Sequence, residues 1–106
     1  MFAYKSVNVV VGQTTIGTSH VSFPAIIINT DANGTMYATI NTALVKTFSD
    51  GSAVSVGQPI ENVNLTALQA DTFKTYDFDT GSEDGTSTVK ALMALLYSFC
   101  ISREAA

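Results

Sequence analysis

The stretch VSFPAIIINTDANGTMYATINTAL, residues 21–44, decides the fold. Near its centre, Asn33-Gly34 tolerates the positive φ angles of a tight hairpin turn. After this turn, apolar and polar side chains alternate through residues 36–44, which predicts a long strand with one face toward a core. Before it, residues 25–28 form a short apolar run typical of a buried strand. Pro24 lacks a backbone donor and therefore belongs at a strand start, a sheet edge or a bulge.

The segments on either side continue the pattern of strands and turns. Residues 2–11 are rich in β-branched and aromatic side chains at a period near two, which predicts a strand. GQTTIGTSH, residues 12–20, contains two glycines and four hydroxyl side chains, so we expect a loop there. Toward the C-terminus, residues 49–52 predict a turn and residues 53–56 a short strand.

Residues 60–79 leave two interpretations open. Asn64 is placed to cap a short helix over residues 65–70, but the alternation of ENVNLTAL also suits a strand. We expect a strand or a turn of helix, followed by an extended segment at residues 73–78.

The clearest single element is a helix at about residues 86–103. Its apolar side chains recur at steps of three and four residues, and we expect four of them to form the core: Leu92, Met93, Leu96 and Phe99. Cys100 belongs to the same stripe, which suits a buried thiol. The reverse side is also largely apolar, so the sheet should cover one side and a neighbouring subunit the other.

Together these segments predict one α+β domain over residues 1–106. An antiparallel sheet or small β-sandwich, at about residues 2–79, is closed by the single C-terminal helix. No disulfide is expected, because the chain contains one cysteine.

The composition indicates a protein that is covered by other polypeptide. Only 13% of the residues are charged, about half the usual share, while Thr, Ser and Asn number 14, 10 and 6. Charged side chains are depleted from the cores of protein interfaces, so a neutral polar surface loses little when another subunit covers it. The open alternative is an ordinary monomeric β-domain with Thr-rich strands.

The same composition argues against several classes of partner. The net charge is −4 and the five basic residues are scattered, whereas nucleic-acid binding needs clustered Lys and Arg. No stretch reaches the roughly 18 apolar residues of a membrane span. The N-terminus does not match a signal peptide, so we expect a chain made in a reducing cytosol, with no nucleic-acid or membrane partner.

An acidic stretch, DFDTGSEDG at residues 77–85, is the main candidate site. An EF-hand counted from Asp77 would need Gly at position six and Glu at position twelve, where this chain has Ser82 and Thr88. We therefore expect no metal and no cofactor. A looser oxygen site remains as an alternative, with four weak candidate ligands: Asp77, Asp79, Glu83 and Asp84.

Catalysis by these carboxylates is not expected. A carboxylate pair acts as acid and base only where burial separates the two pKa values, and this loop is predicted to be solvated. Instead, Asp84, Thr86 or Ser87 should cap the following helix. Asp77 and Asp79 should point toward solvent or a basic partner. A hydrolase would need His20 beside a nucleophile such as Ser19 or Cys100, and no nucleophile-elbow pattern is present, so we expect no enzyme.

Three features carry a resemblance to known structural proteins. They are the scarcity of Lys and Arg, the lack of a reactive cluster, and the Ser/Thr/Ala/Val-rich strands of residues 7–45 (VNVVVGQTTIGTSHVSFPAIIINTDANGTMYATINTALV). The layout resembles small structural proteins of tailed bacteriophages, in particular head decoration or cement proteins. The resemblance implies a location in the virion, a homo-oligomer, and the major capsid protein or other virion subunits as partners. A head–tail or tail component would look similar.

For this structural role we expect four contact residues: Phe2, Tyr4, Tyr97 and Ile101. The rival class is a small binding module, an inhibitor or adaptor, that uses the acidic stretch against a basic partner.

Overall fold

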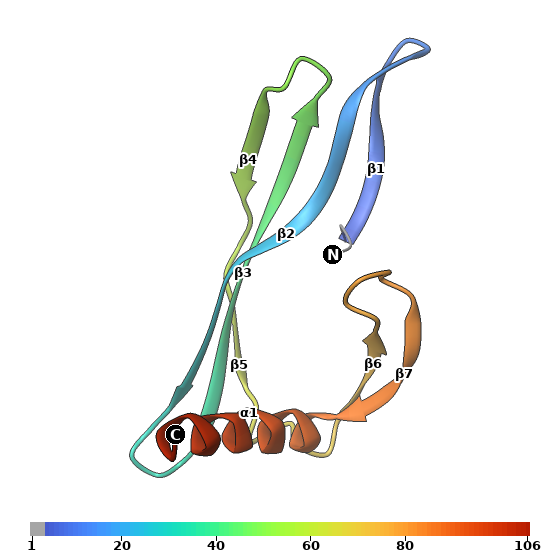
Figure 1. Ribbon diagram of the computed structural model, residues 1–106. Helices are drawn as coiled ribbons and strands as arrows, with labels where there is room; N and C mark the ends of the chain where they lie inside the picture. The colour runs from blue at the N-terminus through green and yellow to red at the C-terminus, as the bar shows by residue number, and fades with distance from the viewer. Residues whose placement is uncertain (1–3) are drawn as a thin grey trace.

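A computed structural model describes residues 4–106 as seven strands followed by one helix (Figure 1). The elements are β1 (Tyr4–Val11), β2 (Thr14–Thr30), β3 (Met36–Phe48), β4 (Ala53–Gly57), β5 (Glu61–Asn64), β6 (Thr72–Tyr76), β7 (Glu83–Thr88) and α1 (Val89–Glu104). Every pairing is antiparallel. The predicted α+β class, with one C-terminal helix, is confirmed, and the sheet is open.

The main sheet has the order β1-β2-β3-β4, and β5 pairs with the other end of β3. β2 and β3 run the length of the molecule, so the sheet has two halves: an upper half of β1, β4 and the adjoining parts of β2 and β3, and a lower half that carries β5 (Figure 1). α1 crosses the lower half. β6 and β7 form a separate hairpin that stands away from the main sheet.

This arrangement gives an extended molecule. It measures 54 × 30 × 28 Å with a radius of gyration of 17.6 Å, against about 13 Å for a compact domain of this length. Its accessible surface of 7738 Å² is about 2,000 Å² more than a compact monomer of 11.2 kDa exposes. The chain therefore leaves uncovered a surface that a globular domain of this size would bury.

The core is correspondingly small. Ala38, Leu65 and Val89 are buried together, and the partly buried side chains of Met36, Val63 and Met93 pack against them. Among the described residues, no large side chain is fully buried. Because α1 is apolar nearly all round and only its first turns reach this cluster, most of the helix has no covering layer.

Two expectations for the helix core are wrong. Leu92, Met93 and Leu96 are half-buried, but Phe99 is 66% exposed and Cys100 is also exposed. Both residues lie in the half of α1 that extends beyond the buried cluster. Helical periodicity predicted a shared apolar stripe, but the sheet does not cover its whole length.

The start of the helix also differs from the prediction. Residues 83–88 form β7, paired with β6, so α1 begins at Val89 and its N-cap is Thr88, whose Oγ1 accepts a hydrogen bond from the Ala91 N–H at 3.1 Å. Asp84, Thr86 and Ser87, the predicted caps, lie within the strand. β-branched threonines in this segment favour the strand once β6 supplies a partner.

The predicted loop at residues 12–20 is wrong as well. Only Gly12 and Gln13 form a turn, and Gly12 has a φ of 61°. From Thr14 onward the backbone belongs to β2, paired with β1 on one side and with β3 on the other. The hydroxyl side chains that suggested a loop are mostly threonines, which strands accept readily.

The central hairpin of residues 21–44 is present, but its connection is longer than a two-residue turn. Thr30 pairs with Met36, which leaves a five-residue loop at 31–35. Asp31 Oδ1 accepts from the backbone N–H groups of Asn33 and Thr35 at 2.9 and 3.0 Å. Gly34, with a φ of 81°, supplies the left-handed position, so the loop needs glycine there.

The two interpretations of residues 60–79 both describe part of the segment. β5 covers Glu61–Asn64, and successive turns follow over residues 65–70. Asn64 Oδ1 accepts from the Ala67 N–H at 3.0 Å, as expected of a cap. β6 then supplies the predicted extended segment.

Irregularities in β2 adapt this long strand to its neighbours. The pairing with β3 shifts register between Ser22 and Ala25, so Pro24 lies at a bulge, one of its three expected positions. A second shift, against β1, lies beside Gly17. A Cβ on Gly17 would overlap the carbonyl oxygen of Thr47 and lie 2.9 Å from the Phe48 Cα, so the β3 backbone leaves no room for a side chain.

We predict that Gly17→Ala destabilises the sheet. The added methyl group must displace backbone atoms of β3, which corresponds to an overpacking cost of about 1–3 kcal/mol. Thermal unfolding at fixed protein concentration should show a lower Tm. Gly57→Ala is the matched control, because nothing lies within 4 Å of a Cβ built there. Equal Tm values for the two variants would contradict the prediction.

Candidate functional site

The main sheet has one face that α1 partly covers, which we call the inner face. Because successive side chains of a strand point to opposite faces, Ala38, Ile40, Leu44 and Lys46 of β3 all lie on it. Ala38 belongs to the buried cluster beneath α1. Leu44 and Lys46 pair with β4 and therefore lie in the upper half. This half has no helix over it (Figure 1).

Cross-strand register extends the inner face of the upper half over four strands. Leu44 lies opposite Val21 on one side and Val56 on the other. Lys46 lies between Ser19 and Val54, and Ser19 in turn pairs with Val7. Paired residues share a face, so these side chains form one surface.

Apart from Lys46 and the buried Ser19, the inner face of the upper half is largely apolar, and several of its side chains are uncovered. Val54 and Val56 are 50% and 52% exposed, and Val7 is exposed as well. The opposite face carries polar side chains at the positions between these residues. Thr18 of β2 pairs with Thr47 of β3 there, and Ser55 of β4 lies on the same face. In a sheet with one polar and one apolar face, the apolar face is the one that packs against another layer.

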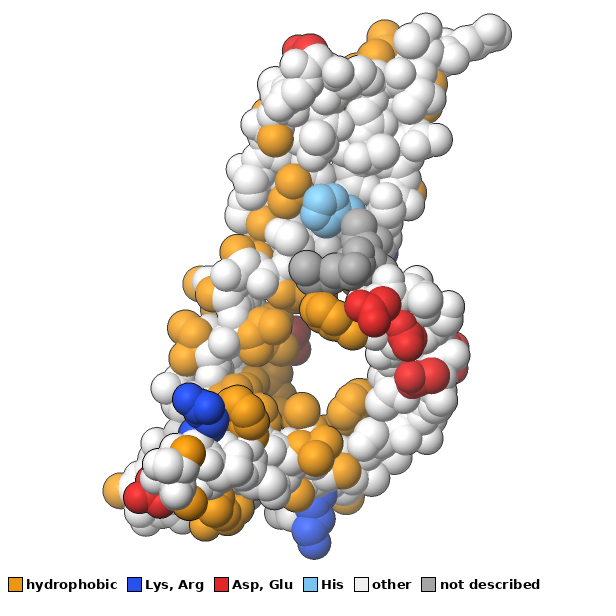
Figure 2. All heavy atoms as spheres, in the orientation of Figure 1, with side chains coloured by type: hydrophobic (Ala, Val, Ile, Leu, Met, Phe, Trp, Pro, Cys, Tyr) orange, Lys and Arg blue, Asp and Glu red, His pale blue; other side chains and the backbone are white. Residues whose placement is uncertain are grey.

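In the lower half, an apolar groove separates α1 from the sheet. Its volume is about 250 Å³, and the residues that line it are Ile26, Ile28, Ala38, Ile40, Val63, Leu65, Leu92 and Leu96. Ile26 and Ile28 are exposed although they face the helix. Figure 2 shows an opening bordered by hydrophobic side chains between α1, the main sheet and the β6–β7 hairpin. The helix therefore fills this groove only in part.

The predicted contact residues do not form one patch. Tyr97 and Ile101 lie about one turn apart on α1, and Tyr97 is 64% exposed. Tyr4 lies on β1, where its ring packs on that of Phe23 at a centroid distance of 6.0 Å and Lys5 Nζ lies 5.4 Å from its centroid. Phe2 lies outside the described residues.

Other exposed apolar side chains were not singled out from the sequence: Val54, Val56, Phe78 and Leu95. Val54 and Val56 flank Ser55, an alternation too short to predict a face. Phe78 lies between Asp77 and Asp79 in the acidic stretch, where the charged side chains predict a solvated loop. Their significance depends on cross-strand register and on the position of the hairpin.

The acidic stretch forms a structured turn at the end of the β6–β7 hairpin. Asp77 Oδ1 accepts from the backbone N–H groups of Thr80 and Asp79, both at 2.9 Å, and these bonds hold the pKa of Asp77 below its usual value. Asp84 accepts from the Thr75 hydroxyl at 2.6 Å, and Glu83 lies 3.7 Å from Lys74 Nζ. Three of the four carboxylates therefore have roles within the hairpin itself.

The fourth carboxylate, that of Asp79, makes no hydrogen bond or ion pair within residues 4–106. Across the same residues, no group of three or more His, Cys, Asp or Glu side chains converges in the geometry of a metal site. Asp77, Glu83 and Asp84 are thus neighbours in sequence that serve separate local contacts, and the Asp79 carboxylate makes no contact of this kind among the described residues.

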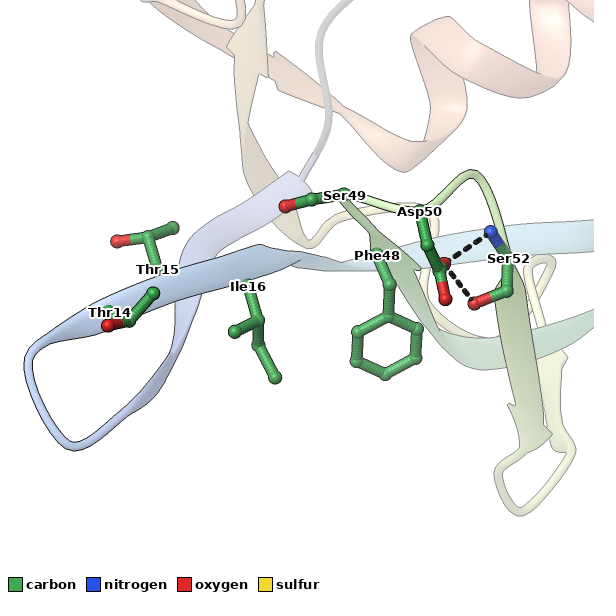
Figure 3. A pocket seen from close by; sticks show the side chains of 7 residues that line it. All are labelled: Thr14, Thr15, Ile16, Phe48, Ser49, Asp50 and Ser52. Atoms are coloured by element: carbon green, nitrogen blue, oxygen red, sulfur yellow. Dashed lines mark hydrogen bonds between the residues drawn. The ribbon is translucent and has the colours of Figure 1, made fainter.

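A hollow of about 440 Å³ lies at the far end of the upper half (Figure 3). Ile16 and Phe48 point to the same side of the strands there. Asp50 lies in the adjoining turn and accepts from the Ser52 hydroxyl at 2.6 Å and the Ser52 N–H at 2.9 Å, which lowers the pKa of Asp50. The carboxylate thus stabilises a turn, beside an apolar surface with a rim of hydroxyl groups.

The residues considered for hydrolysis are not arranged as a catalytic pair. Ser19 and His20 are consecutive in β2 and therefore point to opposite faces of the sheet. Ser19 is buried beside Lys46. Cys100 lies on the exposed part of α1.

Comparison with models of known protein families finds no match, and neither curated protein sequences nor solved structures match this chain. Within residues 4–106, α1 is the only helix, and it does not combine the length and the apolar character that a membrane span requires.

We predict a titration midpoint for Asp77 that is lower in the folded chain than in the unfolded chain. Its usual pKa is 3.8, and the two N–H donors favour the ionised form. The stabilisation is therefore present above pH 3.8 and is lost as the pH falls through the lower folded value. Side-chain carboxyl NMR shifts, with and without denaturant, measure both midpoints. A folded midpoint equal to or above the unfolded one would be inconsistent with these bonds.

We also predict that calcium does not stabilise the protein. Asp77, Glu83 and Asp84 are each engaged in a different contact of the hairpin, so a cation would have to displace those contacts to gather its ligands. Thermal melting in millimolar CaCl₂ should give the Tm found in EDTA at equal ionic strength. A Tm that rises steadily with calcium concentration would instead reveal a site.

Proposed function

We propose that this chain is a non-enzymatic structural subunit of a larger particle, of the kind that decorates or cements a bacteriophage head. One observation carries the proposal: the single chain buries almost no core and leaves its apolar faces uncovered. A protein that worked alone would have to stay folded with these surfaces in water. A subunit of an assembly buries them against its neighbours.

The size of the uncovered surface supports an obligate assembly. A standard interface buries about 800 Å² on each partner. The excess of about 2,000 Å² over a compact monomer corresponds to more than two such interfaces per chain. Obligate interfaces are also the more hydrophobic class, in agreement with the exposed valine, leucine and phenylalanine side chains.

The scarcity of charge supports the same role. Within the described part of the chain, Lys74–Glu83 is the one ion pair, and it is exposed. An assembly built from apolar and hydroxyl-bearing surfaces depends little on ion pairs, so it should persist when salt screens charges. This property suits a protein that stabilises a particle in a changing environment.

The extended shape favours a subunit that reaches across several neighbours. A molecule 54 Å long is able to contact more than one copy of a lattice protein at once. β1 and β4 are the lateral strands of the upper half, and each offers unpaired N–H and C=O groups at its outer edge. The partners we propose are the major capsid protein or other virion subunits, with the chain located in the virion. A head–tail or tail component would use the same surfaces.

A small acidic binding module is the second candidate. The observation that favours it is the Asp79 carboxylate at the hairpin tip, which has no partner among residues 4–106. This function requires a stable monomer whose complex with a basic partner weakens as salt rises.

We predict that the isolated protein is an oligomer at both low and high salt. Size-exclusion chromatography with light scattering, in 50 mM and 1 M NaCl, measures the mass directly. A mass that is a multiple of 11.2 kDa in both buffers is expected, because apolar burial is not weakened by salt. A single folded species of monomer mass in both buffers would overturn the structural proposal.

A further inference from the structure

The β6–β7 hairpin needs a covering surface. It is a two-stranded sheet, a form that is only marginally stable in water without a further layer. Tyr76 and Phe78 project from it, and Phe78 is 67% exposed. An aromatic side chain beside the tip of a protruding hairpin has the form of an anchor that inserts into a partner.

The inner face of the upper half needs a covering layer of its own. Val54 and Val56 lie at its β4 side, each about half exposed. Lys46 lies directly opposite Val54, and Leu44 lies opposite Val56. This surface and the hairpin tip are thus two uncovered apolar regions of one chain. They do not cover each other within that chain, since Phe78 and both valines remain exposed.

The charges of the two regions are complementary. Residues 72–88 contain one lysine and four carboxylates, for a net charge of −3. The upper half, residues 4–23 and 43–57, contains Lys5, Lys46 and Asp50, for a net charge of +1. Within residues 4–106, neither Asp79 nor Lys46 forms an ion pair. Opposite net charges on two apolar surfaces favour contact between them and disfavour contact of either with itself.

From these observations we propose that the hairpin tip of one copy docks on the inner face of the upper half of a second copy. Phe78 packs against Val54 and Val56, and Asp79 approaches Lys46. This inference rests on the proposed function and specifies its homo-oligomeric contact. A second copy is the fitting occupant because a chain with so little core requires covering as it folds, when other copies of itself are present.

The contact joins two different surfaces, so it is head-to-tail. Each copy offers one tip and one face, and the arrangement closes into a ring when the rotation between copies divides a full turn. The two surfaces proposed to meet are the hairpin tip and the inner face of the upper half, and substitutions on either surface test the contact.

Disruption of either surface should lower the oligomer mass toward 11.2 kDa. We would compare Phe78→Ser and Val56→Asp with Ser55→Asp, a control that adds the same charge to the neighbouring residue on the opposite face of β4. Both test variants should require at least a tenfold higher concentration to assemble, and the control should behave as the wild type. If the wild type is oligomeric and both test variants assemble equally well, the docking inference fails while the structural proposal stands. If the wild type is a monomer, both fail.

Cross-linking tests the contact without disrupting it. In a Cys100→Ser background, a chain with Phe78→Cys and Val56→Cys should form disulfide-linked multimers on mild oxidation. The matched chain with Phe78→Cys and Ser55→Cys should not, because Ser55 points to the other face. Equal cross-linking of the two chains, or none in the first, would overturn the inference.

A charge exchange tests the pairing of Lys46 with Asp79. Lys46→Asp and Asp79→Lys should each weaken assembly about two- to fivefold at low salt, the range of an exposed ion pair. The double variant restores opposite charges at every contact and should recover most of the loss. Additive losses in the double variant would show that these two side chains do not meet.

Discussion

The rest of this structure depends on the hydrogen-bonded ladder of β2 and β3, because the single chain buries few apolar side chains. β2 and β3 form a long ladder that spans the whole molecule, so hydrogen bonds within the chain define its shape. Apart from Ala43, the buried apolar residues of the described chain form one small cluster of Ala38, Leu65 and Val89. Hydrogen bonds alone contribute modestly once competition with water is counted, so a sheet of this length needs a covering layer. Here most of that layer is missing from the single chain.

Sequence patterns predicted the parts of the fold that one strand or one helix determines by itself. The alternation through residues 36–44 identified β3 and its inner face, and the apolar periodicity after residue 88 identified α1. Residues 12–20 and 83–88 were misjudged because threonine, serine and glycine occur in loops and strands alike. Both segments form strands because another strand pairs with each of them, and the local sequence of a segment does not show its pairing partner.

The candidate surface was predicted less completely, for a related reason. Periodicity shows which side chains share a face, but it does not show which faces another layer covers. Phe99 and Cys100 were therefore assigned to the core although both are exposed. Tyr97 and Ile101 are both exposed, and the contact role expected of them stays a prediction. Val54 and Val56 are identified as part of the inner face only by the cross-strand register, which pairs them with Lys46 and Leu44.

An extended sheet with open edges and apolar faces risks indiscriminate association, and several local features restrict it. At the β1 edge, Lys5 has a φ of 53° beside a register shift, and such bulges disfavour continued strand pairing. The face opposite the valines presents threonine and serine, which water solvates well. Lys46 places a charge within the apolar inner face, so a partner that lacks a carboxylate at that position would bury the charge unpaired. Selectivity thus resides in the faces of the sheet, where a charged side chain distinguishes one covering surface from another.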